Sequence, residues 1–244
     1  MSQCSHNHNF LLKSAKHPYC CQRCGQLGFG MSYSCEKSEC NLFSHKECEN
    51  PKSLVQHPFS TKCVFKFYTS RSGKGCLCHV CGKGIKGYHY GCSCNFVKRY
   101  AHPSCLTYEP TLEAFDGLTM NLHKVAPAKC LHCMNENLCS KVDGWAYVSP
   151  CGLYCYHVSC VMKIINDNWK KVFMNGTSDP FQTIREKFPS HVNRMNKMGK
   201  GKRKVRDPKK VATAQKVATA FSVIFNVLTG NRQGLVGDAE KFFG

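Results

Sequence analysis

Cysteine and histidine occur in this chain at fixed, repeated spacings, an arrangement that suits metal binding. Twenty of the 244 residues are Cys and 12 are His, and the last Cys is Cys160. Structural zinc takes four nitrogen or sulfur ligands in a closed tetrahedron. A Cys-x2-Cys pair occurs three times, and a His-x2-Cys pair follows it each time. The pairs are Cys21/Cys24 and His45/Cys48, Cys78/Cys81 and His102/Cys105, and Cys130/Cys133 and His157/Cys160.

Disulfide bonds are the competing explanation for so many cysteines. They persist in secreted proteins and are rare in the cytosol. The N-terminus shows no basic segment followed by an apolar one, so no secretory signal is visible, and no apolar run predicts a membrane-spanning helix. Disulfides also give no reason for His at fixed distances from Cys. We therefore expect an intracellular protein, in the nucleus, the cytoplasm or both, whose cysteines bind metal.

The three repeats share further features. Each has a middle pair of cysteines, preceded by a tyrosine, and these pairs are Cys35/Cys40, Cys92/Cys94 and Cys151/Cys155. Gly25 and Gly82 follow the Cys-x2-Cys pairs of the first two repeats, where a tight turn favours a positive φ angle; the third repeat has Met134 instead. The repeats hold few large aliphatic side chains, and metals commonly replace the missing core in domains this small.

The combined pattern resembles a known family, the plant Cys/His-rich proteins built from divergent relatives of the diacylglycerol- and phorbol-ester-binding zinc module of protein kinase C. The first repeat carries the resemblance best, as His8-x12-Cys21-x2-Cys24-x10-Cys35-x4-Cys40-x4-His45-x2-Cys48. The resemblance covers residues 6–160. It implies small zinc-stabilised α+β modules in tandem, each with short antiparallel strands, a short helix and two interleaved zinc sites.

The resemblance assigns ligands to both sites of each module. The first-type sites would be Cys21, Cys24, His45 and Cys48; Cys78, Cys81, His102 and Cys105; and Cys130, Cys133, His157 and Cys160. The second-type sites would use His8 with Cys35 and Cys40, His57 with Cys92 and Cys94, and His123 with Cys151 and Cys155. No late Cys completes the second-type sites as in the kinase module, so we expect three to six zinc ions per chain.

Several other cysteines and histidines have no assigned role. We expect free thiols and surface or structural histidines at most of these positions, with Cys139 a candidate fourth ligand in module three. They are Cys4, Cys20, Cys63, Cys76 and Cys139, and His17, His79, His89 and His132. The Gln-Gly pair that supports the family's diacylglycerol groove is missing before Cys35 and before Cys92. We therefore do not expect diacylglycerol binding.

The Cys-free part of the chain, residues 161–244, carries most of the excess positive charge, with 17 Lys or Arg against six Asp or Glu. Apolar residues at helical spacing predict a helix over residues 160–174. Residues 199–210 hold seven Lys or Arg, a block typical of disordered chain that could bind nucleic acid through phosphates. Residues 211–229 predict an amphipathic helix, and residues 199–229 together could bind an anionic membrane surface.

The predicted organisation is therefore three zinc modules followed by a basic, helical or disordered tail. Its boundaries are 6–52, 57–108 and 122–162 for the modules, 163–198 for a helical extension, 199–210 for a basic linker, 211–229 for the amphipathic helix and 230–244 for a flexible tail. A closed four-ligand site leaves no position for a substrate, so we expect no enzyme. We expect a zinc-binding scaffold that binds a protein partner in intracellular signalling or stress response. The alternatives are binding of nucleic acid or a membrane surface through the tail, and a disulfide reductase.

Overall fold

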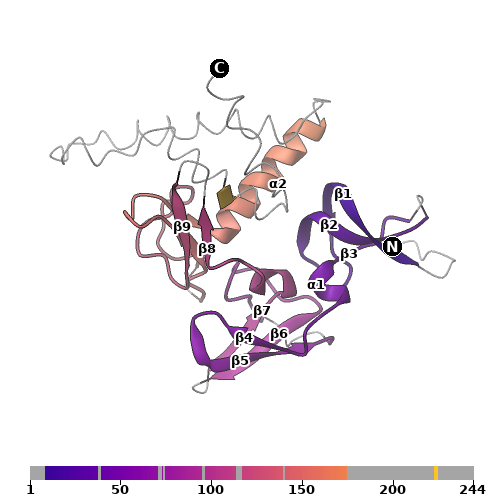
Figure 1. Cartoon of the computed structure of the whole chain (residues 1–244), viewed down its shortest axis with the longest axis horizontal. Coiled ribbons are helices and arrows are strands. Elements are labelled where there is room, and N and C mark those ends of the chain that lie inside the picture. Colours follow the sequence, from indigo (N-terminus) through magenta and orange to yellow (C-terminus); the bar gives the residue numbers. More distant parts are fainter. Residues whose placement is uncertain are drawn as a thin grey trace. The chain divides into compact units, whose positions relative to one another are not determined.

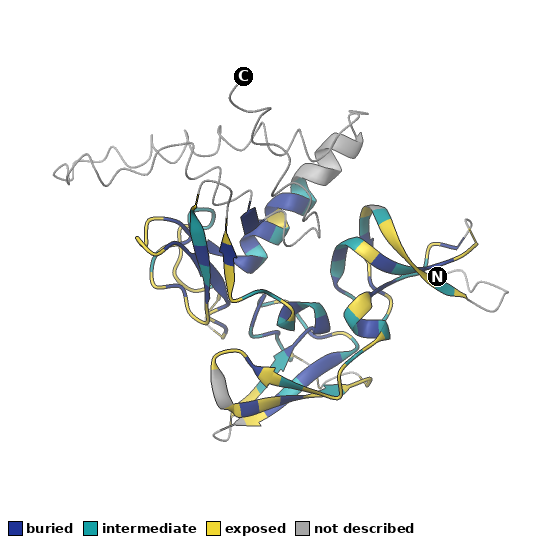
Figure 2. Cartoon of the chain, viewed as in Figure 1, coloured by how far each residue is buried: buried dark blue, intermediate teal, exposed yellow. Residues whose placement is uncertain are grey.

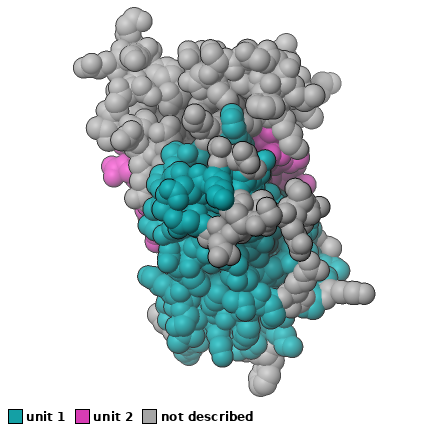
Figure 3. Space-filling model, turned by 90° about the vertical axis from the view of Figure 1, so that its right-hand side faces the viewer, with its two compact units in different colours: residues 1–108, 138–144 teal, residues 109–137, 145–244 magenta. Residues whose placement is uncertain are grey.

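Antiparallel sheet is the main regular structure of the protein in this computed structural model. The structure describes residues 9–37, 40–70, 73, 75–94, 97–113, 117–139, 141–174 and 223–224. Three sheets follow one another along the chain, and each is built from strands that are consecutive in sequence (Figure 1). The chain divides into two compact units, residues 1–108 with 138–144 and residues 109–137 with 145–244 (Figure 3).

The sheet of module one has the strand order β1-β2-β3. Its elements are β1 at Phe10–Cys20, β2 at Leu27–Cys35, β3 at Phe43–His45 and the short helix α1 at Lys46–Glu49. β1 and β2 form a long hairpin in which Cys20 pairs with Leu27 next to the turn. The six residues between these strands therefore include the first Cys-x2-Cys pair, and α1 begins directly after β3.

The sheet of module two has the order β4-β5-β6-β7. Its elements are β4 at Leu54–His57, β5 at Ser60–Tyr68, β6 at His89–Cys94, β7 at Val97–Ala101 and the 3-10 helix η1 at Pro103–Leu106. Buried and exposed residues alternate along β5: Cys63 and Phe65 are buried, whereas Val64 and Lys66 are exposed (Figure 2). This period of two gives the sheet one inward and one outward face.

The sheet of module three has the order β11-β10-β9-β8. Its elements are β8 at Thr111–Glu113, β9 at Thr119–His123, β10 at Ala146–Val148, β11 at Cys155–His157 and helix α2 at Val158–Met174. The largest fully buried side chains of this unit include Met120, Tyr147, Tyr156 and Ile165. The sheet thus includes strands that precede residue 122, and the helix begins two residues before the start predicted from the sequence.

A buried tyrosine ties the middle of modules two and three to the segment that enters each sheet. The Tyr90 hydroxyl donates a 2.7 Å hydrogen bond to the carbonyl oxygen of Lys52, 38 residues earlier. The Tyr147 hydroxyl donates a 2.8 Å hydrogen bond to the carbonyl oxygen of Glu109, also 38 residues earlier. The matching sequence separation shows that the two modules are built on one plan.

The C-terminal predictions fall mostly outside the described residues. These include the helical extension after Met174, the basic linker 199–210, most of the helix 211–229 and the tail 230–244. Val223 and Ile224 are described, and both are helical and buried. Within the described part of the chain, no helix is long and apolar enough to span a membrane.

Candidate metal centres

Each Cys-x2-Cys pair lies in a tight turn with the same backbone hydrogen bonds. In module one the amide of Gly25 donates to the carbonyl of Cys21 at 2.8 Å, and the amide of Cys21 donates to the carbonyl of Gln26 at 2.9 Å. The same two bonds form around Cys78 and around Cys130. The residue after the second Cys has a positive φ in all three turns, at 71° for Gly25, 70° for Gly82 and 61° for Met134. These bonds turn both sulfurs of a pair toward the same point.

Each His-x2-Cys pair lies where a strand passes into a helix. The histidine ends β3 or β11, or follows β7, and the cysteine lies within the first turn of α1, α2 or η1. The His45 amide donates to the Cys21 sulfur at 3.4 Å, and the His157 amide donates to the Cys130 sulfur at 3.4 Å. In modules one and three, the two pairs are thus held together by backbone as well as by side chains.

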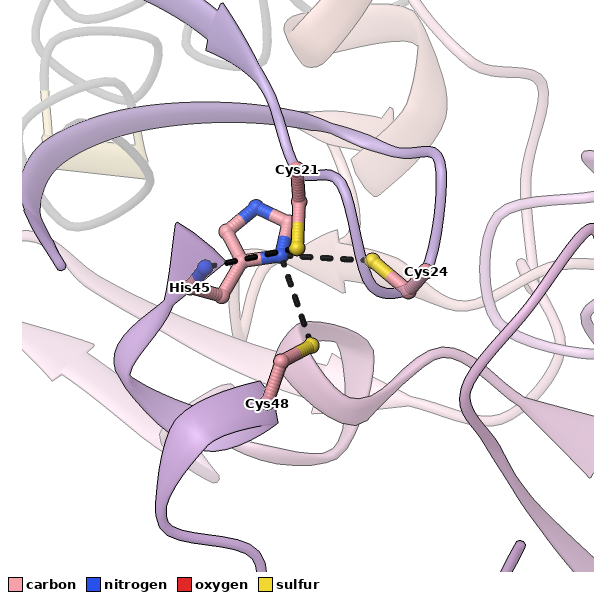
Figure 4. Close-up of side chains that lie close together, drawn as sticks. All are labelled: Cys21, Cys24, His45 and Cys48. Atoms are coloured by element: carbon pink, nitrogen blue, oxygen red, sulfur yellow. Dashed lines mark hydrogen bonds between the residues drawn. The ribbon is translucent and has the colours of Figure 1, made fainter. Parts of the chain in front are cut away.

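The twelve residues of the predicted first-type sites form three clusters. Within each cluster the four ligand atoms lie within 4.8 Å of one another. In module one the side chains of Cys21, Cys24, His45 and Cys48 point toward a common centre (Figure 4). The Nδ1 atom of His45 lies 3.3 Å from the Cys24 sulfur and 3.8 Å from the Cys48 sulfur. The other clusters repeat this geometry, so each histidine presents Nδ1.

The second ring nitrogen of the histidine has a different environment in each cluster. Nε2 of His157 lies 2.8 Å from the carbonyl oxygen of Glu136, and Nε2 of His102 lies 3.3 Å from that of Gly84. An Nε2–H that donates to a carbonyl fixes the tautomer in which Nδ1 binds metal. Nε2 of His45 is buried and has no hydrogen-bond partner among the described residues. Among the described residues, the histidine of cluster one therefore lacks the contact with a carbonyl oxygen that orients the histidines of the other two clusters.

An ion pair braces cluster one instead. Arg23, between the two cysteines of the turn, contacts Glu49, the residue after Cys48 in α1. Its Nε lies 3.0 Å from one carboxylate oxygen and its Nη2 lies 3.4 Å from the other. A bidentate contact of this kind restricts orientation more than a single charge pair does. It joins the segment that carries Cys21 and Cys24 to the helix that carries Cys48.

The closely spaced ligands of each cluster shift one another's pKa values. Hydrogen bonding to Cys160 lowers the pKa of Cys130 to about 3, although burial acts in the opposite direction. Burial lowers the pKa of His45, but hydrogen bonds to Cys21 and Cys24 outweigh it and raise that pKa to about 10. Negative charge on sulfur is therefore stabilised by protons held on neighbouring ligands. A divalent cation can take the place of those protons, because thiolate and neutral imidazole are the ligand forms that bind metal.

The second-type residues of module one are described only in part. Cys35 and Cys40 are both buried, with exposed fractions of 6% and 5%. Cys35 ends β2, and the Cys40 amide donates a hydrogen bond to the carbonyl of Lys37. His8 lies outside the described residues. The structure therefore places the two cysteines of this predicted site but not its histidine.

In module two, Cys92 has a partner that the sequence analysis did not assign. It forms a disulfide with Cys63, which was expected to be a free thiol. Cys63 lies on β5 and Cys92 on the neighbouring strand β6. His57 is buried, and its Nδ1 accepts a hydrogen bond from the Phe59 amide at 3.0 Å. The side chain of Cys94 is outside the described part. Cys63 was missed because its pairing depends on strand register and not on a local spacing.

The second-type residues of module three do not form a group with one another among the described residues. His123 and Cys151 are exposed. Cys155 packs in a buried apolar cluster with Ala126, Ala146 and Val148. Burial raises the pKa of Cys155 to about 12, which keeps the thiol protonated near neutral pH. Cys139, the candidate fourth ligand, is exposed and also stands outside the three clusters.

Several of the cysteines and histidines without an assigned role lie apart from the three clusters. Cys20 is exposed and Cys76 is half-buried. Nδ1 of His79 accepts a hydrogen bond from the Tyr100 amide at 3.2 Å, and the buried His89 stacks on Tyr68. Cys4 lies outside the described residues.

Three Cys3His clusters that can hold metal ions are therefore the main chemical feature of the described chain. Comparison of the chain with protein-family models, with curated proteins and with solved structures found no match. Three sulfur ligands and one imidazole nitrogen are a ligand set that structural zinc takes. The clusters point to a zinc-binding protein with about three sites.

Proposed function

We propose that this protein is a non-catalytic scaffold whose three modules are held by zinc and whose surface binds a protein partner. The observation that carries the proposal is the closure of each cluster. Four protein ligands surround one point, and all twelve ligand residues are buried except the half-buried Cys133. A catalytic zinc site keeps one position open for water or substrate. A cluster with four protein ligands leaves none.

The ligand set favours zinc over other metals. Three thiolates with one imidazole select soft or borderline metals, and a closed tetrahedral site of this composition is typical of structural zinc. The residues that would hold it are Cys21, Cys24, His45 and Cys48 and their equivalents in the other two modules. Bound zinc would supply folding free energy that the small sheets lack.

The resemblance to divergent relatives of the diacylglycerol-binding module belongs to this proposal. It is supported by the order of Cys-x2-Cys and His-x2-Cys pairs, which recurs three times. From the resemblance we infer a role in signalling or stress response, inside the cell. A disulfide reductase is disfavoured because each Cys-x2-Cys pair faces a histidine and a third cysteine, which is a metal-binding arrangement rather than a redox one.

Metal analysis of the purified full chain tests the proposal. We expect three zinc ions per chain, and two in the Cys105→Ser variant, because that change removes one ligand of cluster two. The chain is expected not to reduce the disulfides of insulin. A wild-type zinc content below two per chain, or insulin reduction that is lost in a Cys21→Ser variant, would contradict the proposed function.

A further inference from the structure

Module two differs from the rest of the chain in its charge. No Asp or Glu occurs between Glu49 and Glu109. The same stretch holds nine basic residues, which are Lys52, Lys62, Lys66, Arg71, Lys74, Lys83, Lys86, Lys98 and Arg99. A divalent ion bound by three thiolates would add a single negative charge, so the module stays strongly cationic. A cationic module attracts polyanions, and the excess positive charge is therefore not confined to the C-terminal tail.

The outward face of the sheet β4-β5-β6-β7 brings basic and aromatic side chains together around a hollow. Residues two apart on a strand share a face, which places Lys66 and Tyr68 of β5 together. The hollow has a volume of about 420 Å³, and its lining includes Lys66, Tyr68, His89, Gly91, Lys98 and Tyr100. The hollow lies wholly within one module, on strands whose pairing is fixed by main-chain hydrogen bonds.

Gly91 makes the floor of the hollow. It pairs with Lys66 on β5 and with Tyr100 on β7, so it lies between these two strands. A Cβ atom at this position would lie 3.1 Å from a ring carbon of Tyr68, which is closer than ordinary contact. Because Gly91 has no side chain, the surface stays open between the two tyrosines.

The aromatic rings around this floor are held in place by one another. Tyr68 stacks on His89 with ring centroids 5.4 Å apart and an interplanar angle of 18°. Tyr100 meets His89 at 5.7 Å in an edge-on arrangement. His89 is only 4% exposed, whereas Tyr68 is 41% exposed. A buried ring thus orients a tyrosine that remains open to solvent, which lowers the entropic cost of binding a flat ligand.

Two lysines lie beside these rings without an acidic partner. The Lys66 ammonium is 6.0 Å from the centroid of the Tyr68 ring. Lys98 is exposed on β7, where it pairs with Ser93 across the sheet. Among the described residues neither lysine forms an ion pair, and the module contains no carboxylate side chain that could compete with an anionic ligand.

We propose that this face binds single-stranded nucleic acid, with bases stacked on Tyr68 and Tyr100 and phosphates next to Lys66 and Lys98. Proteins that bind single strands combine a cationic surface with exposed aromatic rings, because every base has a face that can stack. A site for phosphate alone would not need the ordered rings, and a duplex would not offer its base faces. This inference goes beyond the scaffold role proposed above and uses none of the metal ligands.

Fluorescence anisotropy of a labelled 12-nucleotide oligothymidylate with the zinc-loaded full chain tests the inference. Tyr68→Leu is expected to weaken binding about tenfold, because one stacked base is lost. Tyr68→Phe should bind like the wild type, since it keeps the ring. Lys66→Gln combined with Lys98→Gln should weaken binding and lower the slope of log K against log salt by about 1.4, at about 0.7 per phosphate contact.

The matched control is Lys83→Gln combined with Lys86→Gln, which removes the same charge from exposed positions of the same module outside the hollow. The basic tail is present in every variant, so differences in binding between variants arise from the substituted residues of module two. Unchanged binding by Tyr68→Leu would overturn the inference, as would an equal loss in the control. Loss of binding to phosphatidylserine vesicles by Tyr68→Leu, with oligothymidylate binding intact, would overturn it in favour of a membrane surface. Zinc content measured on each variant shows that the modules remain folded.

Discussion

Met134 holds a backbone conformation that glycine holds in the other two modules. Its φ of 61° matches the 71° of Gly25 and the 70° of Gly82. A residue with a Cβ atom pays about 1–2 kcal/mol in this left-handed region, and glycine does not. The Met134 side chain is 51% exposed, so little packing is lost with it. We expect Met134→Gly to stabilise module three by about 1 kcal/mol, less the entropy gained by the unfolded chain.

Thermal unfolding of the zinc-loaded chain measures this effect, and Met134→Ala is the matched control. Alanine also removes the side chain but keeps the Cβ atom. The glycine variant should therefore melt at a higher temperature than the alanine variant. Equal melting temperatures would show that the backbone strain in the turn after Cys133 does not exceed the entropy that glycine adds to the unfolded chain.

Cys155 provides a second test at a single residue, because the resemblance assigned it to a metal site and the structure buries it among alanine and valine. Cys155→Ala should leave the zinc content unchanged. It should lower the free energy of unfolding by about 1 kcal/mol, as is usual for a small loss of buried volume. Cys160→Ala, five residues along the same chain segment, should lose one zinc ion. Equal zinc losses in the two variants, measured by elemental analysis, would show that Cys155 is a zinc ligand.

The difference between Cys160 and Cys155 shows which ligands a sequence can identify. His157 and Cys160 meet because only two residues separate them across the start of a helix, and Cys130 and Cys133 meet within one turn. Such local spacings are visible in the sequence. The partner of Cys63 is not visible in the sequence, because Cys63 and Cys92 meet through the register of β5 and β6 at a sequence separation of 29. The unfavourable backbone angle of Met134 leaves only one trace in the sequence, which is a methionine where the other two repeats have glycine.

At the scale of elements, the Cys63–Cys92 disulfide joins strands that already pair through main-chain hydrogen bonds. Closing a loop of this length lowers the entropy of the unfolded chain, which stabilises the folded state by about 3–4 kcal/mol. Cys63→Ser should therefore destabilise module two. The loss should be clear in denaturant unfolding under oxidising conditions and absent in the presence of a reductant.

Thiol counting gives a direct check on this bond. The chain has 20 cysteines, and this disulfide lowers by two the number of thiols that are counted when the metal-chelated chain is denatured without reductant. Cys63→Ser should give one thiol more than the wild type, because Cys92 is released as its partner is removed. A count of 20 in the wild type would show that the two sulfurs are not bonded.

The elements were predictable to different degrees for physical reasons. Helix α2 follows from apolar residues at helical spacing, and the structure extends the predicted start by two residues to Val158. Strand β8 and the first three residues of β9 lie before residue 122, where the predicted module three begins, because no cysteine or histidine marks them in the sequence. Their place in the sheet is set by the pairing of β9 with β10, by the pairing of β8 with β9, and by the hydrogen bond from Tyr147 to Glu109. Pairing between distant segments leaves little trace in the local sequence.

At the scale of the whole molecule, each sheet meets its metal cluster at one end. The ligands come from a turn and from a strand end about 20 residues further along, so a bound ion joins the two segments of each module that carry them. The described sheets have small cores, and their ligands are among the most buried residues. The stability of the chain should therefore depend on metal binding and, through the ligands, on pH.

The His45 proton and zinc binding respond to pH in opposite directions. In the metal-free cluster the pKa of His45 is raised to about 10, above its unfolded value of 6.5. Protonation of His45 then stabilises the metal-free fold below pH 6.5, and this contribution is lost as the pH rises toward 10. Zinc must displace that proton, so zinc affinity should rise about tenfold per pH unit for each displaced proton between pH 7 and 8. Competition with a zinc-chelating dye measures this rise, and circular dichroism should show the zinc-loaded chain unfolding as the pH is lowered. A zinc affinity that does not change with pH would mean that the clusters hold no protons for zinc to displace.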